Sequence, residues 1–411
     1  MLIKIKNIFI ILLTLSYFSE IIINSINFNP LIYERSKILG VPINDLWLII
    51  GCIFFIKFII KESFKIEEWI LIIWQLVIII IGIIIGVSSL NWNNINEINS
   101  DVRINLSFMA GMGLSFLIVY NKKKIEIKKQ AELIVKICII SIIVSSLFYA
   151  TIREINIYSD LDPYRIIPAN IFIISGILIP IIIIFTPIME KELLVYSLIT
   201  LIIFLVILSG TRSMMIVTFV TYLIVIKLKK YQSQILDINK IKYFKLTIII
   251  LIILAISSWY FSGVERIFNN FSIKSIYNDP RFYEVLEFLS VFSLIDNPFG
   301  LGFGSLINSP IYNGNLTGII HIGIFNFIMK SGLLGAGFII YIILYVIIKS
   351  IKNLKLDKKI IKEDILLAKS SLYSFYPWFI FLIISGGYGE TNFLMAGFAL
   401  GIFILYKKNE R

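Results

Sequence analysis

The chain has 411 residues, of which 58% are hydrophobic and 16% charged. Soluble domains are about 45–50% apolar and about 25% charged, so this composition excludes an ordinary soluble enzyme, and the scarcity of polar residues excludes a disordered chain. The formal net charge of +12 would suit a nucleic-acid-binding protein, but in a membrane protein an excess of Lys and Arg marks the cytoplasmic loops. Cys52 and Cys138 lie inside apolar runs, which leaves no disulfide framework and no cysteine-based metal site. We therefore expect an all-α, polytopic integral membrane protein that does not bind nucleic acid.

Apolar stretches long enough to cross a membrane recur along the whole chain. A membrane helix needs about 20 apolar residues to span about 30 Å of hydrocarbon. The first stretch follows Lys4 and Lys6 and has no small-residue cleavage site, so it predicts a signal anchor that is retained. Twelve spans are predicted, at 7–24, 44–60, 69–90, 103–120, 132–151, 166–188, 193–210, 212–227, 246–263, 321–348, 370–387 and 391–406.

The distribution of basic residues predicts the orientation of these spans. If the N-terminus is cytoplasmic, most of the 38 Lys and Arg residues fall in cytoplasmic segments, as the positive-inside rule requires. Both termini are then cytoplasmic. Residues 1–263 form nine spans, 264–320 form one large outer loop, and 321–411 form three more spans and a cytoplasmic tail.

Arginine departs from this rule. Seven of the eight arginines fall in segments predicted to lie outside, although nearly all lysines lie inside or within spans. The planar guanidinium fork grips a phosphate or carboxylate with two hydrogen bonds, which an ammonium group cannot do. Some of these arginines could pair with acidic residues of the outer loops. As a set they favour an anionic substrate handled on the outer face, most simply a lipid-linked phosphate or diphosphate. The outer arginines are Arg35, Arg103, Arg153, Arg165, Arg212, Arg266 and Arg281.

The outer loop at 264–320 contains two recognisable features. Apolar residues at helical spacing between Asp279 and Leu294 predict an amphipathic helix that lies on the membrane or caps a cavity. The helix is followed by Asn297-Pro298 and by glycines at every second position, Gly300, Gly302 and Gly304. Such glycines permit close backbone approach and leave N–H groups that could hold a phosphate, although a plain turn has the same composition.

These motifs resemble the signature region of the O-antigen ligase and O-antigen polymerase family of bacterial membrane glycosyltransferases. The family pattern is an arginine, a helix, a D-x-P-x-x-G-x-G turn, then H-N and a glycine pair eleven and fourteen positions after the histidine. Here Arg281 precedes the helix, Asp296 to Gly304 form the turn, and Gly332 and Gly335 stand at those offsets from His321. Upstream, the run from Ser209 to Ser213 resembles the family's S-x-S-R hairpin. Ile322 replaces the asparagine after the histidine, a departure that points away from the ligase branch.

The resemblance implies glycosyl transfer from an undecaprenyl-diphosphate-linked sugar on the outer face of the bacterial cytoplasmic membrane, with no cofactor and no metal. A polymerase joining repeat units into O-antigen or capsular polysaccharide is the leading expectation. The alternatives are a ligase that moves finished glycan to a lipid or protein acceptor, and a flippase. A chain-length regulator and a flippase of the same pathway are expected partners, besides lipid-linked oligosaccharides and membrane lipid.

Roles for individual residues follow from this chemistry. Diphosphate is a good leaving group, so the transition state mainly needs positive charge beside the departing oxygens. We expect Arg281 and Arg212 to supply that charge. His321 is the only histidine, and it would either take the proton of an acceptor hydroxyl or bind phosphate. Glu284 or Glu287 could serve as the base instead, or form the solvated face of the helix. The expected substrate-binding residues are Arg266, Arg165, Glu284, Gly302 and Gly304.

Overall fold

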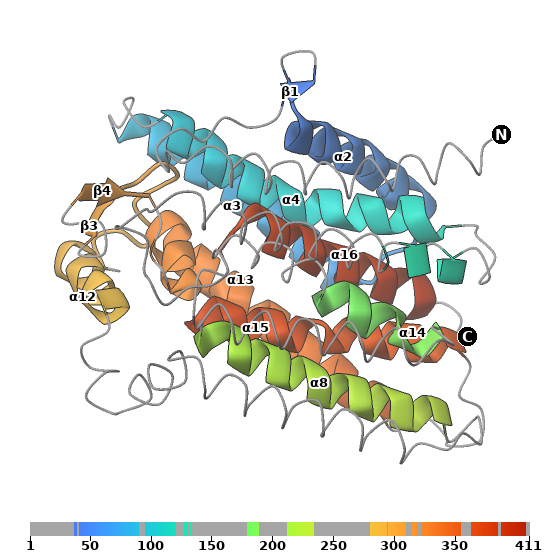
Figure 1. Ribbon diagram of the computed structural model, residues 1–411. Coiled ribbons are helices and arrows are strands. Elements are labelled where there is room, and N and C mark those ends of the chain that lie inside the picture. The colour runs from blue at the N-terminus through green and yellow to red at the C-terminus, as the bar shows by residue number, and fades with distance from the viewer. Residues whose placement is uncertain are drawn as a thin grey trace, which may run out of the picture. The chain divides into compact units, whose positions relative to one another are not determined.

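The computed structural model of this protein is mostly helical (Figure 1). Two short antiparallel hairpins, β1–β2 and β3–β4, accompany the helices. The residues that the structure describes are 37–38, 41–89, 95–120, 127–129, 132–133, 136, 179–188, 212–233, 280–293, 295–309, 315–318, 320, 322–354, 363–384 and 388–407.

Four of the described helical segments are long and apolar enough to cross a membrane, namely Ile66–Ser88, Ile95–Val119, Gly323–Ile351 and Asp364–Ile383. Shorter apolar helical segments occupy Ile216–Leu228 and Asn392–Tyr406. The described residues therefore support a membrane-embedded all-α protein. The count of twelve spans and the cytoplasmic location of both termini stay predictions. The described helices are α2 (Ile43–Lys61), α3 (Ile66–Ser88), α4 (Ile95–Val119), the 3-10 turn η2 (Thr186–Ile188), α8 (Arg212–Ser233), α12 (Pro280–Val291), α13 (Gly323–Leu354), α14 (Glu363–Tyr373), α15 (Phe375–Ile384) and α16 (Glu390–Lys407).

Two of the predicted spans begin earlier than the hydropathy of the sequence indicated. The span expected at 103–120 belongs to α4, which starts at Ile95, and the span expected at 370–387 is preceded by helix from Glu363. In α14 the hydroxyls of Ser370 and Ser371 donate to carbonyl oxygens three residues earlier, which lets polar residues continue a buried helix. In α4 the charged residues Asp101 and Arg103 are each paired with an oppositely charged residue, as described below.

The chain divides into two compact units. The first consists of residues 1–49 and 118–269; in it α8 packs against η2. The second consists of residues 50–117 and 270–411 and holds α3, α12 to α16, β3 (Ile307–Ser309), β4 (Asn315–Thr317) and most of α2 and α4. The remaining hairpin pairs β1 (Lys37–Ile38) with β2 (Val41–Pro42) in the first unit.

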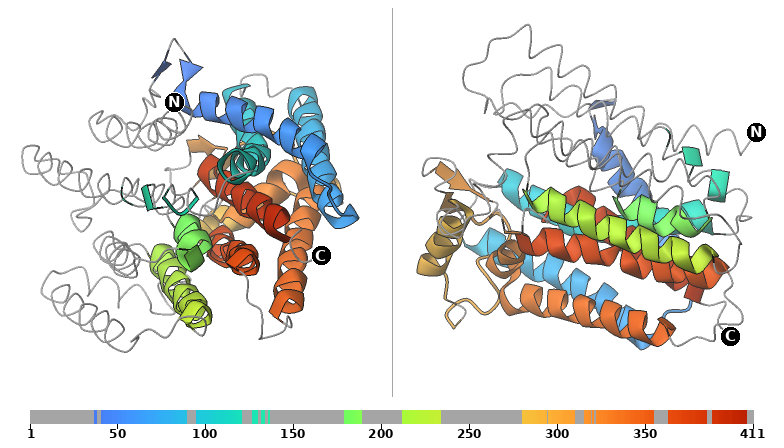
Figure 2. Two further views of the ribbon diagram at one scale, coloured as in Figure 1. Left: turned by 90° about the vertical axis from the view of Figure 1, so that its right-hand side faces the viewer. Right: turned by 60° about the horizontal axis from the view of Figure 1, so that its bottom comes forward.

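In the second unit, α3, α4, α13, α15 and α16 run alongside one another (Figure 2). Tyr345 near the end of α13 donates to Glu68 at the start of α3, so these two helices are antiparallel. Gly111 and Gly397 place α4 and α16 in backbone contact, and the two run in the same direction. These directions agree with the alternation expected of spans three, four, ten and twelve. Small residues allow this close approach between membrane helices. Such packing matters because the hydrophobic effect does not drive the association of helices within lipid.

One end of this bundle carries α12 and the β3–β4 hairpin, and we call it the loop end (Figure 1). It belongs to the segment 264–320 that the sequence predicts to lie outside. The expected helix between Asp279 and Leu294 is confirmed as α12. Near this end α13 is kinked at Gly332, whose φ of 55° lies outside the helical region. At Gly332 the helix lies against the backbone of residues 298–300, so that a Cβ atom there would be 2.2 Å from the carbonyl oxygen of Pro298 and 2.4 Å from the backbone nitrogen of Gly300.

Candidate functional site

The glycine turn, residues 298–305, is inserted between α3 and α13 at the loop end. A Cβ atom on Gly82 of α3 would lie 2.5 Å from the ring of Phe303, and one on Gly302 would lie 2.5 Å from the backbone nitrogen of Gly86. On the opposite side, a Cβ atom on Gly300 would lie 2.6 Å from the backbone nitrogen of Gly332. Both faces of the turn are thus in backbone contact with a helix, which no larger residue would permit.

Backbone hydrogen bonds join the turn to both helices. The N–H of Leu301 donates to the carbonyl of Met329 in α13 at 2.7 Å, and the N–H of Phe303 donates to the carbonyl of Gly82 in α3 at 2.9 Å. The N–H of Gly304 donates to the Asp101 carboxylate at 2.8 Å. Gly302 and Gly304 have φ values of 85° and 79°, in the region that favours glycine. The structure therefore gives Gly302 a packing role and Gly304 a hydrogen bond to Asp101, and the contact of both glycines with substrate stays a prediction.

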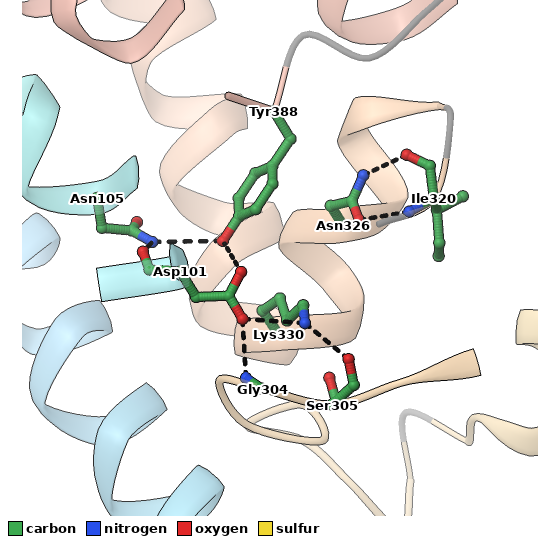
Figure 3. A network of polar contacts seen from close by, with 8 residues as sticks. All are labelled: Asp101, Asn105, Gly304, Ser305, Ile320, Asn326, Lys330 and Tyr388. Atoms are coloured by element: carbon green, nitrogen blue, oxygen red, sulfur yellow. Dashed lines mark hydrogen bonds and ion pairs between the residues drawn. The ribbon is translucent and has the colours of Figure 1, made fainter. Parts of the chain in front are cut away.

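A buried ion pair lies against the turn (Figure 3). The ammonium of Lys330 is 2.9 Å from the Oδ2 atom of Asp101, and the two side chains are 0% and 3% exposed. The same ammonium donates to the carbonyl of Ser305 at 2.7 Å. The carboxylate of Asp101 in α4 thus accepts a hydrogen bond from the backbone of the turn and forms an ion pair with Lys330 of α13. The ammonium of Lys330 in turn donates a hydrogen bond to a backbone carbonyl of the turn. One carboxylate and one ammonium together join two helices to a loop.

Neutral polar groups complete this network. The hydroxyl of Tyr388 donates to Asp101 at 3.3 Å, and the side-chain amide of Asn105 donates to the Tyr388 oxygen at 3.4 Å. Gln75 of α3 then donates to the Asn105 side chain at 2.9 Å. Burial, and after it the charge of Asp101, hold the pKa of Tyr388 well above its usual value, so the phenol remains a proton donor.

A hydrophobic cluster joins three parts of the predicted site at the loop end. Its buried members come from α12, β3, α13 and the segment just before His321. Partly buried residues from the turn, and from both sides of the point where α13 begins, pack against them. The three parts are the helix that carries Arg281, the glycine turn and the His321 segment. The cluster consists of Val285, Phe288, Phe292, Ile307, Ile320 and Met329, with Leu301, Ile322, Phe325 and Ile328 packed against it.

Asn326 holds the backbone that precedes His321. Its side chain is buried, and it accepts from the N–H of Ile320 at 2.7 Å and donates to the carbonyl of the same residue (Figure 3). A side-chain amide that bonds both polar groups of one residue acts as a local substitute for secondary structure. His321 itself lies outside the described residues, but the residues on both sides of it pack against the same cluster.

The other predicted site residues differ in how buried they are and in which of the two units they belong to. Arg281 lies in the first turn of α12 and is half-buried. Glu284 is completely buried, so the expectation that it belongs to a solvated helix face is wrong for this residue. Arg212 begins α8 in the first unit. Arg165 and Arg266, like His321, lie outside the described residues.

Asp101, Lys330 and Tyr388 are residues that sequence reasoning missed. Lys330 falls within the span predicted at 321–348, and Asp101 falls just before the span predicted at 103–120. The available signal was the presence of Lys330 in an apolar run, because a charge inside a membrane span calls for a partner.

A second ion pair accounts for one of the outer arginines. Arg103 of α4 lies 3.1 Å from the Glu390 carboxylate at the start of α16, with both side chains partly exposed. Pairing with an acidic residue, the alternative to binding an anionic substrate, therefore accounts for Arg103.

Comparison of the chain with protein-family models, curated proteins and solved structures found no match. Within the described residues there is no group of three or more His, Cys, Asp or Glu side chains that could hold a metal ion. The absence of metal and cofactor from the reaction stays an expectation.

Proposed function

We propose that the protein is a polymerase that joins undecaprenyl-diphosphate-linked oligosaccharide repeat units into O-antigen or capsular polysaccharide on the outer face of the bacterial cytoplasmic membrane. The observation that carries the proposal is the hydrophobic cluster at the loop end. Arg281, the glycine turn and His321 are far apart in the sequence motif, and the segments that bear them pack on one another. A motif whose parts converge in space is better support for a site than the same residues scattered over the surface.

The proposed reaction is a metal-independent displacement. A hydroxyl of the acceptor glycan attacks the anomeric carbon of the donor, a new glycosidic bond forms, and the bond from that carbon to the diphosphate oxygen breaks. The leaving group is undecaprenyl diphosphate, and the hydroxyl proton goes to His321. Arg281 stabilises the negative charge that develops on the departing oxygens through a two-bond contact. Arg212 is assigned the same role on sequence grounds alone.

In this scheme the buried network has a supporting role. Because Asp101 and Lys330 hold the glycine turn against α4 and α13, they fix the loop that lies beside α12. Catalytic groups must be held close to a productive geometry by such supports. The network lies at the loop end, in the first turns of α4 and α13. A flippase would be expected to place its buried charges at the bilayer midplane.

The proposal is tested by deleting the gene and sizing the surface glycan on a gel. The expected result is loss of the long-chain ladder, with single repeat units remaining attached to their acceptor. The wild-type gene should restore the ladder, and Arg281→Ala and Arg281→Lys should both fail to do so, because an ammonium cannot form the forked phosphate contact. Arg103→Gln is the matched control, since this outer arginine pairs with Glu390 and should leave the ladder intact.

Other outcomes would replace the proposal. Accumulation of long, unattached lipid-linked polymer would identify a ligase, and accumulation of repeat units on the cytoplasmic face would identify a flippase. An immunoblot of an epitope tag, with equal band intensity for every variant, is required before an absent ladder is attributed to chemistry.

A further inference from the structure

The helix α12 has its polar and apolar residues in unusual places. Its only completely buried charged residue, Glu284, faces the protein, whereas Phe282, Tyr283, Leu286 and Leu289 are each about half exposed. With 100° between successive residues, these four apolar residues lie on one side of the helix, and we call them the apolar face of α12. A helix bordering water would place such residues inward and its charges outward.

The depth of α12 relative to the bundle argues against water on the apolar face. On the opposite side of α12, the ring of Phe288 packs edge-on against Phe325, with 6.1 Å between ring centroids, in a hydrophobic cluster to which α13 contributes Phe325, Ile328 and Met329. These residues lie within Gly323–Ile351, one of the helical segments apolar enough to cross a membrane. Since α12 is packed beside the first turns of a membrane-spanning helix, its outward side is at the level where that helix enters the bilayer.

Other apolar residues near the loop end of the same unit are exposed as well. Leu333 on α13 and Ile84 near the loop end of α3 are more than half exposed, as helix residues that contact lipid are. Beyond α12 the chain exposes Ile295, at 92%, and Phe299, at 48%. Exposed aromatic and aliphatic residues next to spanning helices are typical of segments that lie in the membrane interface.

We propose that α12 lies in the membrane–water interface of the outer leaflet, with its apolar face inserted among phospholipid chains. The sequence left open whether this helix rests on the membrane or caps a cavity, and the orientation of its residues decides for the membrane. Arg281, in the first turn of α12, is then held at the depth of lipid headgroup phosphates. This inference about the substrate rests on the proposed function. An Arg281 at that depth would bind the phosphate of a membrane-anchored substrate that approaches along the bilayer, and not the phosphate of a substrate dissolved in water.

The test is site-directed spin labelling of the full-length protein in phospholipid nanodiscs. Cys52 and Cys138 are replaced by Ser, and single cysteines are introduced as Leu286→Cys and Leu289→Cys on the apolar face. Ile80→Cys on the exposed side of α3 serves as the lipid reference, and Asn308→Cys on the exposed side of β3 serves as the water reference. Relaxation by oxygen, which partitions into lipid, is compared with relaxation by a water-soluble nickel chelate.

We expect the labels at positions 286 and 289 to be relaxed several-fold more by oxygen than by the nickel chelate, as at position 80, and the label at 308 to show the reverse. Nickel accessibility equal to that of position 308 would overturn the proposal. Low accessibility to both agents would also overturn it, because the face would then be covered by protein. So would spin–spin broadening that disappears on dilution with unlabelled protein, which would indicate a second copy.

A second measurement uses the unmodified protein. A phospholipid with a photoreactive diazirine in its acyl chain should attach to the peptide containing residues 282–289 as well as to α3. Labelling of α3 without labelling of that peptide would contradict the interfacial position. Neither measurement depends on enzymatic activity, so a failed glycan assay and a failed depth measurement would point to different errors.

Discussion

The ammonium of Lys330 lies 2.9 Å from the carboxylate of Asp101, with both side chains removed from solvent. Neither charge has water to stabilise it, so each depends on the other and on the hydrogen bonds around them. Because those bonds include Gly304 and Ser305, the pair links the stability of the bundle to the conformation of the glycine turn.

Removal of one partner of this pair should be strongly destabilising. We expect Lys330→Met or Asp101→Asn to cost about 3–5 kcal/mol, because each leaves an uncompensated buried group. The double variant should recover part of that loss, since no unpaired charge remains. Thermal unfolding in detergent provides the measurement. Single variants that unfold at the wild-type temperature would show that the pair contributes nothing.

The hydroxyl of Tyr388 should contribute a smaller, pH-dependent amount. Tyr388→Phe removes a donor to Asp101, and we expect a loss of about 1–3 kcal/mol. Because folding raises the pKa of Tyr388 above the usual value of 10.0 for a phenol, this contribution should be constant below about pH 10 and decrease above it, where the unfolded chain loses its phenol proton first.

The comparison for that variant is Tyr341→Phe, whose hydroxyl donates to the carbonyl of Glu67 at an exposed site. It should change the unfolding temperature less than Tyr388→Phe does. Equal shifts for the two variants at neutral pH would contradict the special position of Tyr388. Measurements at pH 7, 9 and 11 would follow the pH dependence.

Gly302 should not tolerate a methyl group. Gly302→Ala forces a positive φ on alanine, at a cost of about 1–2 kcal/mol, and places the Cβ atom 2.5 Å from the backbone nitrogen of Gly86. Gly389→Ala is the matched control, because its Cβ atom would meet nothing nearer than 3.9 Å. Yield of folded protein and unfolding temperature should both fall for the first variant and remain near wild type for the second.

The ion pair between Arg103 and Glu390 should contribute little to stability. It is partly exposed to solvent, and such pairs contribute about 0.2–1 kcal/mol. A double-mutant cycle of Arg103→Gln and Glu390→Gln should give a coupling energy in that range, and it should decrease with added salt. A coupling of several kcal/mol, insensitive to salt, would indicate that the pair is buried in the membrane-embedded protein.

The composition and the periodicity of the sequence were enough to predict the class of the fold and several of its helices. Apolar runs are a strong signal because each spanning helix must satisfy its own backbone hydrogen bonds in lipid. The stretches expected at 44–60, 69–90 and 391–406 are helical with nearly the same ends in α2, α3 and α16. The helix α12 was also predictable, since its apolar residues follow the helical period.

The tertiary structure decided which side of α12 faces the protein and which charges pair. Phe282 and Val285 contribute equally to the apolar pattern of the sequence, yet only Val285 is buried. Asp101 and Lys330 come from distant parts of the chain, and no local pattern connects them. Periodicity reports the short-range geometry of one helix. The partner of a charge and the orientation of a helix face depend on contacts between helices, which exist only once the chain is packed.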